Sequence, residues 1–284
     1  MAPAPRTPAL VAIVCVTSLA GPALAESHSP AATQPVPLRY DTAESLFVIG
    51  STAYVAALFQ FSVNAQVTRT CRFCEPPAFD RAVRRALVTE NTSTVHVMSD
   101  VAAFGLAPVS AFGTLTWVAG HDERGDEALV NALLVTEAAS TTLAVTQVTK
   151  AGVARERPAV HFGQHGPERY STAERNASFF SGHSSLTFSL AVSSGTVATM
   201  RGYRAAPLVW GVGLPIATFT AYARIAGDAH YFSDVLVGSL VGSGIGFALP
   251  WFAHPRVSEK EGIAWQPRLI PLQGGMGVGM AGSM

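Results

Sequence analysis

Three side chains suited to phosphate chemistry stand just before a long apolar stretch at Val235–Pro250. They are Arg224, His230 and Asp234. His230 and Asp234 are four residues apart, so they share one face if both lie on the first turns of a helix. A carboxylate beside an imidazole holds its tautomer, and a guanidinium offers a fork of donors to a phosphate. Taken alone, these residues fit a salt-bridged helix start with a core histidine equally well.

Two earlier blocks add to this set. Lys150 and Arg157 are seven residues apart, which predicts that they face the same way two turns apart on a helix that Pro158 then ends. Ser181-Gly182-His183 directly precedes the apolar stretch Leu186–Met200. That position places a hydroxyl, an imidazole and free backbone N–H groups at a helix N-terminus, which favours an anion. Together the blocks predict a site that handles phosphate.

The blocks resemble the superfamily of type 2 phosphatidic acid phosphatases, bacterial class A acid phosphatases and vanadium haloperoxidases. In that superfamily six residues separate a lysine from Arg-Pro. Pro-Ser-Gly-His follows, and then Ser-Arg, five residues, His, three residues and Asp. Nine residues match with every internal spacing retained: Lys150, Arg157, Pro158, Ser181, Gly182, His183, Arg224, His230 and Asp234. At about one position in twenty for each residue type, nine such coincidences are not expected by chance. The resemblance spans residues 150–242.

Three positions depart from the superfamily pattern. Phe180 stands where proline usually precedes Ser-Gly-His, and Ala223 replaces the serine before Arg224. Phe232 stands where many members have proline. None of these changes removes a titratable group, so they bear on substrate preference and pocket lining more than on the chemistry.

The resemblance implies a hydrolysis that runs through a phosphohistidine. His230 would attack phosphorus in line, and Asp234 would hold its ring so that the attacking nitrogen keeps a lone pair. His183 would protonate the leaving oxygen and then activate water for dephosphorylation.

The resemblance also assigns the residues that bind the phosphoryl oxygens. The positive charges of Lys150, Arg157 and Arg224 would neutralise these oxygens, which is the main demand in phosphoryl transfer. Ser181 and the backbone N–H of Gly182 would complete the phosphate site. We therefore expect no metal and no other cofactor.

Two alternatives remain at this stage. In a vanadium-dependent haloperoxidase, vanadate would occupy the same pocket, with His230 as the vanadium ligand and His183 as the acid–base group. Halide oxidation with vanadate and peroxide, set against hydrolysis of an aryl phosphate, would separate the two activities. A non-catalytic envelope protein on the same scaffold is the second alternative, and the nine intact positions speak against it.

The composition of the chain limits the kinds of molecule that it is expected to bind. Only 13% of the 284 residues are charged and the formal net charge is zero, which argues against nucleic-acid binding and favours membrane contact. A phosphorylated lipid or other amphiphile is the favoured substrate, although small soluble phosphoesters fit the same site. The substrate itself and the oligomeric state are not specified.

The resemblance and the apolar pattern predict an all-α bundle of about six core helices, of the acid phosphatase and haloperoxidase type. We divide the chain into a signal peptide (1–25), a flexible lead (26–44), the helical phosphatase domain (45–254, motif region 150–242) and a Gly-rich tail (255–284) that is loose or strand-like. The expected helices contain Ser45–Val63, Val95–Ala119, Leu129–Thr149, Leu186–Met200, Pro207–Ile225 and Val235–Phe252.

The sequence also indicates the state of the cysteines, the surroundings of the other histidines and the cellular location of the protein. In an exported protein, Cys71 and Cys74 would form a local disulfide. The loop 159–177 joins two blocks and should border the site. The other histidines are interpreted as solvated polar groups: His28, His96, His121, His161, His165 and His254. We expect an exported protein of the periplasm or cell envelope, either soluble or partly membrane-embedded, with its site outside the cytoplasm.

Overall fold

The computed structural model describes residues 36–257, 264–272 and 275–283 of the chain. The predicted signal peptide and the lead as far as residue 35 lie outside the described residues. Side chains are described for residues 36–257.

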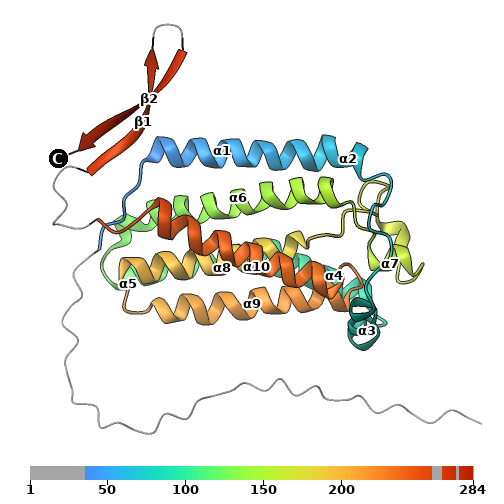
Figure 1. Cartoon of the computed structure of the whole chain (residues 1–284). Helices are drawn as coiled ribbons and strands as arrows, with labels where there is room; N and C mark the ends of the chain where they lie inside the picture. The colour runs from blue at the N-terminus through green and yellow to red at the C-terminus, as the bar shows by residue number, and fades with distance from the viewer. Residues whose placement is uncertain (1–35, 258–263, 273–274, 284) are drawn as a thin grey trace, which may run out of the picture. The chain divides into compact units, whose positions relative to one another are not determined.

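Six long helical segments make up the bundle in this part of the chain (Figure 1). The prediction of an all-α bundle is confirmed. In chain order, the segments are α1 (Thr42–Leu58) with η1 (Phe59–Val63) and α2 (Asn64–Val67); α4 (Thr92–Val101) with η2 (Ala102–Leu106) and α5 (Ala107–His121); η3 (Gly125–Glu127) with α6 (Ala128–Val153); α8 (Gly182–Arg201); α9 (Ala206–Ala226); and α10 (Phe232–Ala248) with η5 (Leu249–Ala253).

Shorter elements occupy the connections and the tail. Helix α3 (Ala78–Leu87) follows the first segment, and α7 (Pro158–His161) and η4 (Pro167–Arg169) lie between α6 and α8. In the tail, β1 (Ala264–Leu272) pairs antiparallel with β2 (Gly275–Ser283). The polar stretch that contains α3 gave no helix prediction from the sequence.

Helix α8 is the centre of the bundle, because it packs against α5, α6, α9 and α10. Nearly all of its residues from Ser184 to Arg201 are buried, although many are serine or threonine. Most of their hydroxyls bond to the helix backbone or to α6, as Ser189 does with Thr142 at 2.9 Å, whereas the hydroxyl of Thr196 has no partner among the described residues. A polar helix can therefore lie inside an apolar bundle, since most of its polar groups have partners.

A seam of small residues joins α8 to α10. A Cβ placed on Gly238, Gly242 or Gly246 would lie 2.7, 2.1 or 2.8 Å from the backbone carbonyl oxygen of Ser181, Ser185 or Ser189. Each of these glycines is four residues from the next, so they form one stripe along α10. Glycine at all three positions lets the two backbones approach closely, as at small-residue interfaces of membrane helices.

The outer surface of the bundle is apolar. Five segments are long and apolar enough to cross a membrane: Thr42–Val67, Thr92–His121, Gly125–Val153, Ala206–Ala226 and Phe232–Ala253. Large hydrophobic side chains are exposed on them, among them Phe47, Tyr54, Phe61, Val109, Trp117, Leu240 and Phe252. An exposed apolar surface of this extent is typical of contact with lipid.

A buried polar pair explains a charge inside one of these segments. The sequence places Glu137 in the middle of α6, which is costly in a bilayer. In the structure Glu137 is buried, and its carboxylate lies 3.1 Å from Nε2 of His254. The expectation of a solvated His254 is therefore wrong, because its ring is buried and pairs with this interior carboxylate.

The helix predicted to carry both Lys150 and Arg157 ends earlier than expected. Helix α6 stops at Val153, because Ala154 adopts a left-handed conformation with φ of 48°. Pro158 begins α7 instead of ending α6. Lys150 and Arg157 therefore lie on different elements, and their seven-residue spacing does not reflect two helical turns.

The α8–α10 seam yields a first prediction. Gly242→Ala should destabilise the protein by about 1–3 kcal/mol, because its methyl group would meet a backbone carbonyl that has no room to move. Thermal unfolding of the purified protein followed by circular dichroism measures this loss.

Gly244→Ala is the matched control on the same helix, since a Cβ there has no neighbour within 4 Å. It should leave the melting temperature unchanged or raise it, because alanine favours a helix over glycine. Equal melting temperatures for the two variants would contradict the close contact.

Candidate active site

One end of the bundle gathers the three sequence blocks. Segments one, three and five end there, and segments two, four and six begin there. A cavity of about 640 Å³ opens between them. The predicted residues that line it are Lys150, Arg157, Gly182, His183, Arg224 and His230. Ser181 and Asp234 are fully buried and do not line the cavity.

His230 lies in the connection between α9 and α10, two residues before α10 begins. Its Nε2 lies 3.1 Å from Nη1 of Arg157. Because a guanidinium only donates, Nε2 must accept and therefore carries a lone pair. The proton of the neutral ring is then on Nδ1, which lies 3.6 Å from Oδ2 of Asp234. Burial, with Arg157 and Arg224 nearby, lowers the pKa of His230 well below 6.5 and keeps the ring neutral.

Asp234 is the third residue of α10 and completes its N-terminus. Its Oδ2 accepts from the backbone N–H of Tyr231 at 3.0 Å and from the hydroxyl of Ser178 at 2.5 Å. Its Oδ1 accepts from Nη1 of Arg155 at 2.5 Å. The carboxylate therefore caps the helix through Oδ2, and the same oxygen lies 3.6 Å from Nδ1 of His230, beyond hydrogen-bond distance, so Nδ1 has no hydrogen-bond partner among the described residues.

Two guanidinium groups are fixed at the cavity wall. Arg157 donates to the carbonyl oxygens of Glu174, Ala177 and Ala229 at 2.8, 3.2 and 3.0 Å. Arg224 donates through Nη1 to Ser99 at 3.0 Å, while its buried Nε has no partner among the described residues. A buried donor without an acceptor is costly, and an oxyanion would satisfy it.

The N-terminus of α8 completes the wall. Ser181 is its N-cap, and Ser181 Oγ accepts from the backbone N–H of Ser184 at 3.4 Å. The hydroxyl is thus engaged within the helix cap and is turned away from the cavity. Gly182 does line the cavity, where a Cβ would lie 3.8 Å from Nζ of Lys150. Its missing side chain leaves the helix terminus open beside the lysine.

His183 has a partner that the sequence did not indicate. Its Nε2 lies 2.8 Å from Oδ1 of Asp100 on α4, and the same carboxylate oxygen lies 3.4 Å from Nη1 of Arg224. Burial and then the Arg224 charge lower the pKa of His183 from 6.5 to about 4, whereas the hydrogen bond to Asp100 raises it. Asp100 thus makes the protonated ring easier to form.

The loop 159–177 borders the cavity as expected, through Arg169, Tyr170 and Glu174. His161 and His165 do not line it. Each instead pairs with a carboxylate, His161 with Glu156 at 3.0 Å and His165 with Asp228 at 2.9 Å. Neither histidine is simply solvated, because each carboxylate partner holds the ring.

His96 and Asp100 are cavity residues that the sequence analysis missed. His96 was interpreted as a solvated polar group, and that interpretation is wrong. Both lie on α4, one turn apart, within an apolar segment. Ionisable residues in such a segment usually face a functional interior, so their presence was a usable signal.

The three departures from the pattern lie around the site and not in it. Phe180 and Ala223 are buried, and Phe232 packs edge-on against Phe79 of α3 with ring centroids 5.3 Å apart. A Cβ on Gly238 would lie 3.5 Å from the Phe180 ring. These side chains therefore support the elements that carry the site residues.

Residues 129–258 match the PAP2 superfamily. The matched segment contains all three blocks, and the resemblance noted in the sequence is confirmed. A crystal structure described as that of the first transmembrane PAP2-type phosphatidylglycerolphosphate phosphatase, from Bacillus subtilis, is 16% identical. The alignment covers 74% of this chain and 95% of that chain, with a TM-score of 0.45. No match was found among curated proteins.

Proposed function

We propose that this protein is a metal-independent phosphatase that hydrolyses a phosphomonoester or diphosphate of a lipid or amphiphile through a phosphohistidine. The observation that carries the proposal is the cavity itself, where His230 and His183 face three basic side chains: Lys150, Arg157 and Arg224. The match to the PAP2 superfamily over this segment supports it.

In the first step, the phosphoryl group enters among the basic side chains. Its oxygens draw the Arg157 guanidinium away from Nε2 of His230, which frees the lone pair for attack on phosphorus. The N–P bond forms as the bond to the leaving oxygen breaks. The negative charge of the bound phosphoryl group raises the pKa of His183 above its value of about 4 in the protein alone, and so favours the protonated ring. Protonated His183 then transfers its proton to the leaving oxygen, and the alcohol or phosphate product departs.

In the second step, water replaces the leaving group. His183, now neutral, accepts a proton from the water as its oxygen attacks phosphorus. The N–P bond breaks, inorganic phosphate leaves, and His230 regains its lone pair. Throughout the cycle, Asp234 faces the proton on Nδ1 and stabilises the positive charge that develops on the ring.

The cavity supports an amphiphilic substrate. Besides its basic residues, the cavity is lined by four apolar side chains: Phe61, Phe104, Leu143 and Leu186. They come from η1, η2, α6 and α8, of which the first three belong to candidate membrane segments. A phosphate head would bind the basic side chains while an acyl or prenyl chain lies against the apolar ones.

His230→Ala should abolish turnover, because the nucleophile is lost, while binding of inorganic phosphate persists on the remaining cations. Release of phosphate is measured over a panel of phosphatidate, phosphatidylglycerolphosphate, a prenyl diphosphate and an aryl phosphate. The lipid substrates should be hydrolysed with higher kcat/KM than the aryl phosphate, and hydrolysis should survive EDTA.

Three results would overturn parts of this proposal. Near-normal hydrolysis by His230→Ala would remove His230 as nucleophile. Loss of activity in EDTA that zinc or magnesium restores would show a metal requirement. Halide oxidation with vanadate and peroxide, without phosphate release, would favour the haloperoxidase alternative, in which His230 holds vanadate.

Asp100→Asn tests the proton donor. Since Asp100 raises the pKa of His183, its loss should lower that pKa further and leave a smaller protonated fraction at pH 7. We expect kcat for a poor leaving group such as phosphatidate to fall by about tenfold or more, and the alkaline limb of the pH profile to move to lower pH. An aryl phosphate with a good leaving group should lose less.

Asp126→Asn is the control, since Asp126 is exposed in η3 at the other end of the bundle. Asp126→Asn should change neither kcat for phosphatidate nor kcat for the aryl phosphate. Equal losses for both leaving groups in Asp100→Asn would contradict a role for Asp100 in proton donation.

We propose further that the cavity end of the bundle lies outside the cytoplasm. The Cys71–Cys74 disulfide joins residues at that same end, which supports an oxidising compartment. Alkaline phosphatase fused after Gln164 should be active, because this exposed loop position lies near the cavity. Fluorescence there from a reporter that matures only in the cytoplasm would place the site inside.

A further inference from the structure

Arg155 holds the carboxylate that faces the nucleophile. Its Nη1 donates to Oδ1 of Asp234 at 2.5 Å and to the hydroxyl of Ser233 at 2.7 Å. Its Nη2 donates to Oδ2 of Asp80 on α3 at 2.7 Å. The Arg155 side chain is only 8% exposed, so these are interior ion pairs. One guanidinium thus bridges two buried carboxylates from different elements.

Asp80 closes this network on the first turn of α10. It accepts from the backbone N–H of Ser233 at 2.9 Å and from the Ser233 hydroxyl at 2.6 Å. Next to it, Phe79 packs against Phe232. Helix α3 therefore contacts Phe232 and Ser233, the two residues directly before Asp234.

The backbone of Arg155 is itself fixed by the loop that the Cys71–Cys74 disulfide closes. Two residues of that loop make backbone hydrogen bonds to the neighbours of Arg155. The N–H of Arg72 donates to the carbonyl oxygen of Ala154 at 2.9 Å, and the N–H of Glu156 donates to the carbonyl oxygen of Phe73 at 3.3 Å. These bonds flank Arg155 on both sides. The disulfide loop therefore braces the segment that connects α6 to Arg157.

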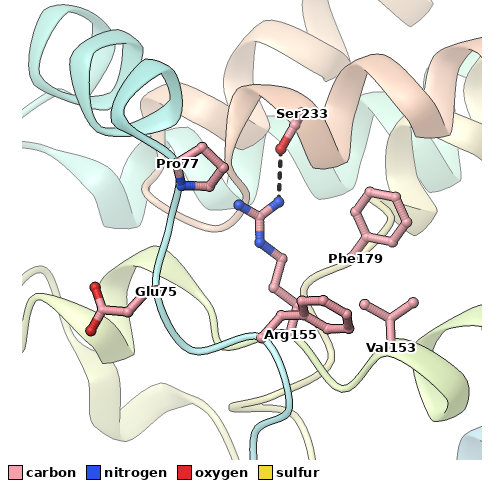
Figure 2. Close-up of a pocket in the computed structure, with 7 residues that line it drawn as sticks. Glu75, Pro77, Val153, Arg155, Phe179 and Ser233 are labelled. Carbon is pink, nitrogen blue, oxygen red and sulfur yellow. Dashed lines mark hydrogen bonds between the residues drawn. The ribbon is translucent and has the colours of Figure 1, made fainter.

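Arg155 has no access to the phosphate. It lines a separate cavity of about 320 Å³ together with Val153, Phe179, Ser233 and residues of the segment 73–77. Figure 2 shows its guanidinium turned toward Ser233, between Pro77 and Phe179. This cavity shares no lining residue with the larger one. Any effect of Arg155 on catalysis must therefore act through Asp234.

We propose that Arg155 is a positioning residue for the His230–Asp234 pair, and that Asp80 holds it in this position. With Oδ1 bound to Arg155, the other oxygen of Asp234 is the one turned toward Nδ1 of His230, 3.6 Å away. Arg155 thereby pairs its positive charge with the carboxylate and fixes its rotation. The kinetic part of this inference rests on the proposed phosphatase function.

Arg155→Gln and Arg155→Lys are compared with the intact chain. We expect Arg155→Gln to lower kcat by roughly 10- to 100-fold while KM and the Kd for inorganic phosphate stay unchanged, because the cations of the larger cavity are untouched. Arg155→Lys should retain part of the activity, since an ammonium keeps the charge but cannot bridge both carboxylates.

Asp80→Asn gives a second, independent variant. It should lower kcat in the same way, and the double variant Asp80→Asn/Arg155→Gln should be no worse than Arg155→Gln alone, as for residues that act as one unit. Arg85→Gln, at an exposed position on the same helix, is the control and should behave like the intact chain. Unchanged kcat in Arg155→Gln, or a loss of phosphate binding equal to the loss of kcat, overturns the proposal.

A readout without turnover separates this proposal from the phosphatase function. In ¹H–¹⁵N NMR spectra, the Nδ1–H group of His230, which faces Asp234, should change its ¹H and ¹⁵N chemical shifts in Arg155→Gln as the carboxylate turns, while Arg157 still keeps Nε2 as the acceptor; His230→Ala assigns the signal. If the intact chain hydrolyses no phosphoester, the proposed function fails while the shift of the Nδ1–H signal still supports Arg155. Identical Nδ1–H shifts in both chains refute the positioning role.

Discussion

The close contact between α8 and α10 sets the geometry on which the site depends. Because Gly238 lies directly against the backbone at Ser181, the first turns of the two helices are held at a fixed separation. One hydrogen bond joins them directly, from the N–H of Ser181 to the carbonyl oxygen of Asp234 at 3.0 Å. His183 and Asp234, to which we assign proton donation and orientation of His230, are therefore parts of one rigid pair of helix ends.

Electrostatics then determine what the cavity can hold. Three buried basic side chains, Lys150, Arg157 and Arg224, meet at the cavity, where burial penalises charge. The two carboxylates that also line the cavity are engaged with other groups: Asp100, which is half exposed, with His183, and Glu174 with Ser171. Uncompensated positive charge of this kind is costly in an apolar bundle and is relieved by an anion. The interior carboxylates are placed elsewhere: Asp80 and Asp234 are paired with Arg155, and Asp228 is paired with Arg84.

The sequence predicted the bundle, and six of the eight site residues that it named line the cavity, because helix periodicity and motif spacing are local properties. It failed where the chain leaves a helix. The left-handed turn at Ala154 is a single-residue event, so the spacing of Lys150 and Arg157 was assigned to a helix that had already ended. Ser181 was likewise assigned to phosphate, although its hydroxyl serves as an N-cap.

The residues that were missed are those defined by contacts across the fold. Asp100 is 83 positions from His183, and Asp80 is 75 from Arg155, so no local pattern connects them. Arg155 stood inside the first block and was passed over because the superfamily pattern names only Lys150 and Arg157. Only the packing of α3 and α4 against the other segments brings these partners together.

The contact between Arg157 and His230 has one more consequence. The guanidinium occupies the lone pair of Nε2, so a positively charged group stands between this nitrogen and the cavity. A transition-metal cation or an alkylating agent would meet that group first, and the surrounding basic side chains would repel the cation as well. Only an anion that attracts Arg157 more strongly than the ring does would expose Nε2. One side chain, Arg157, thus shields this nitrogen and makes its exposure depend on the charge of what enters the cavity.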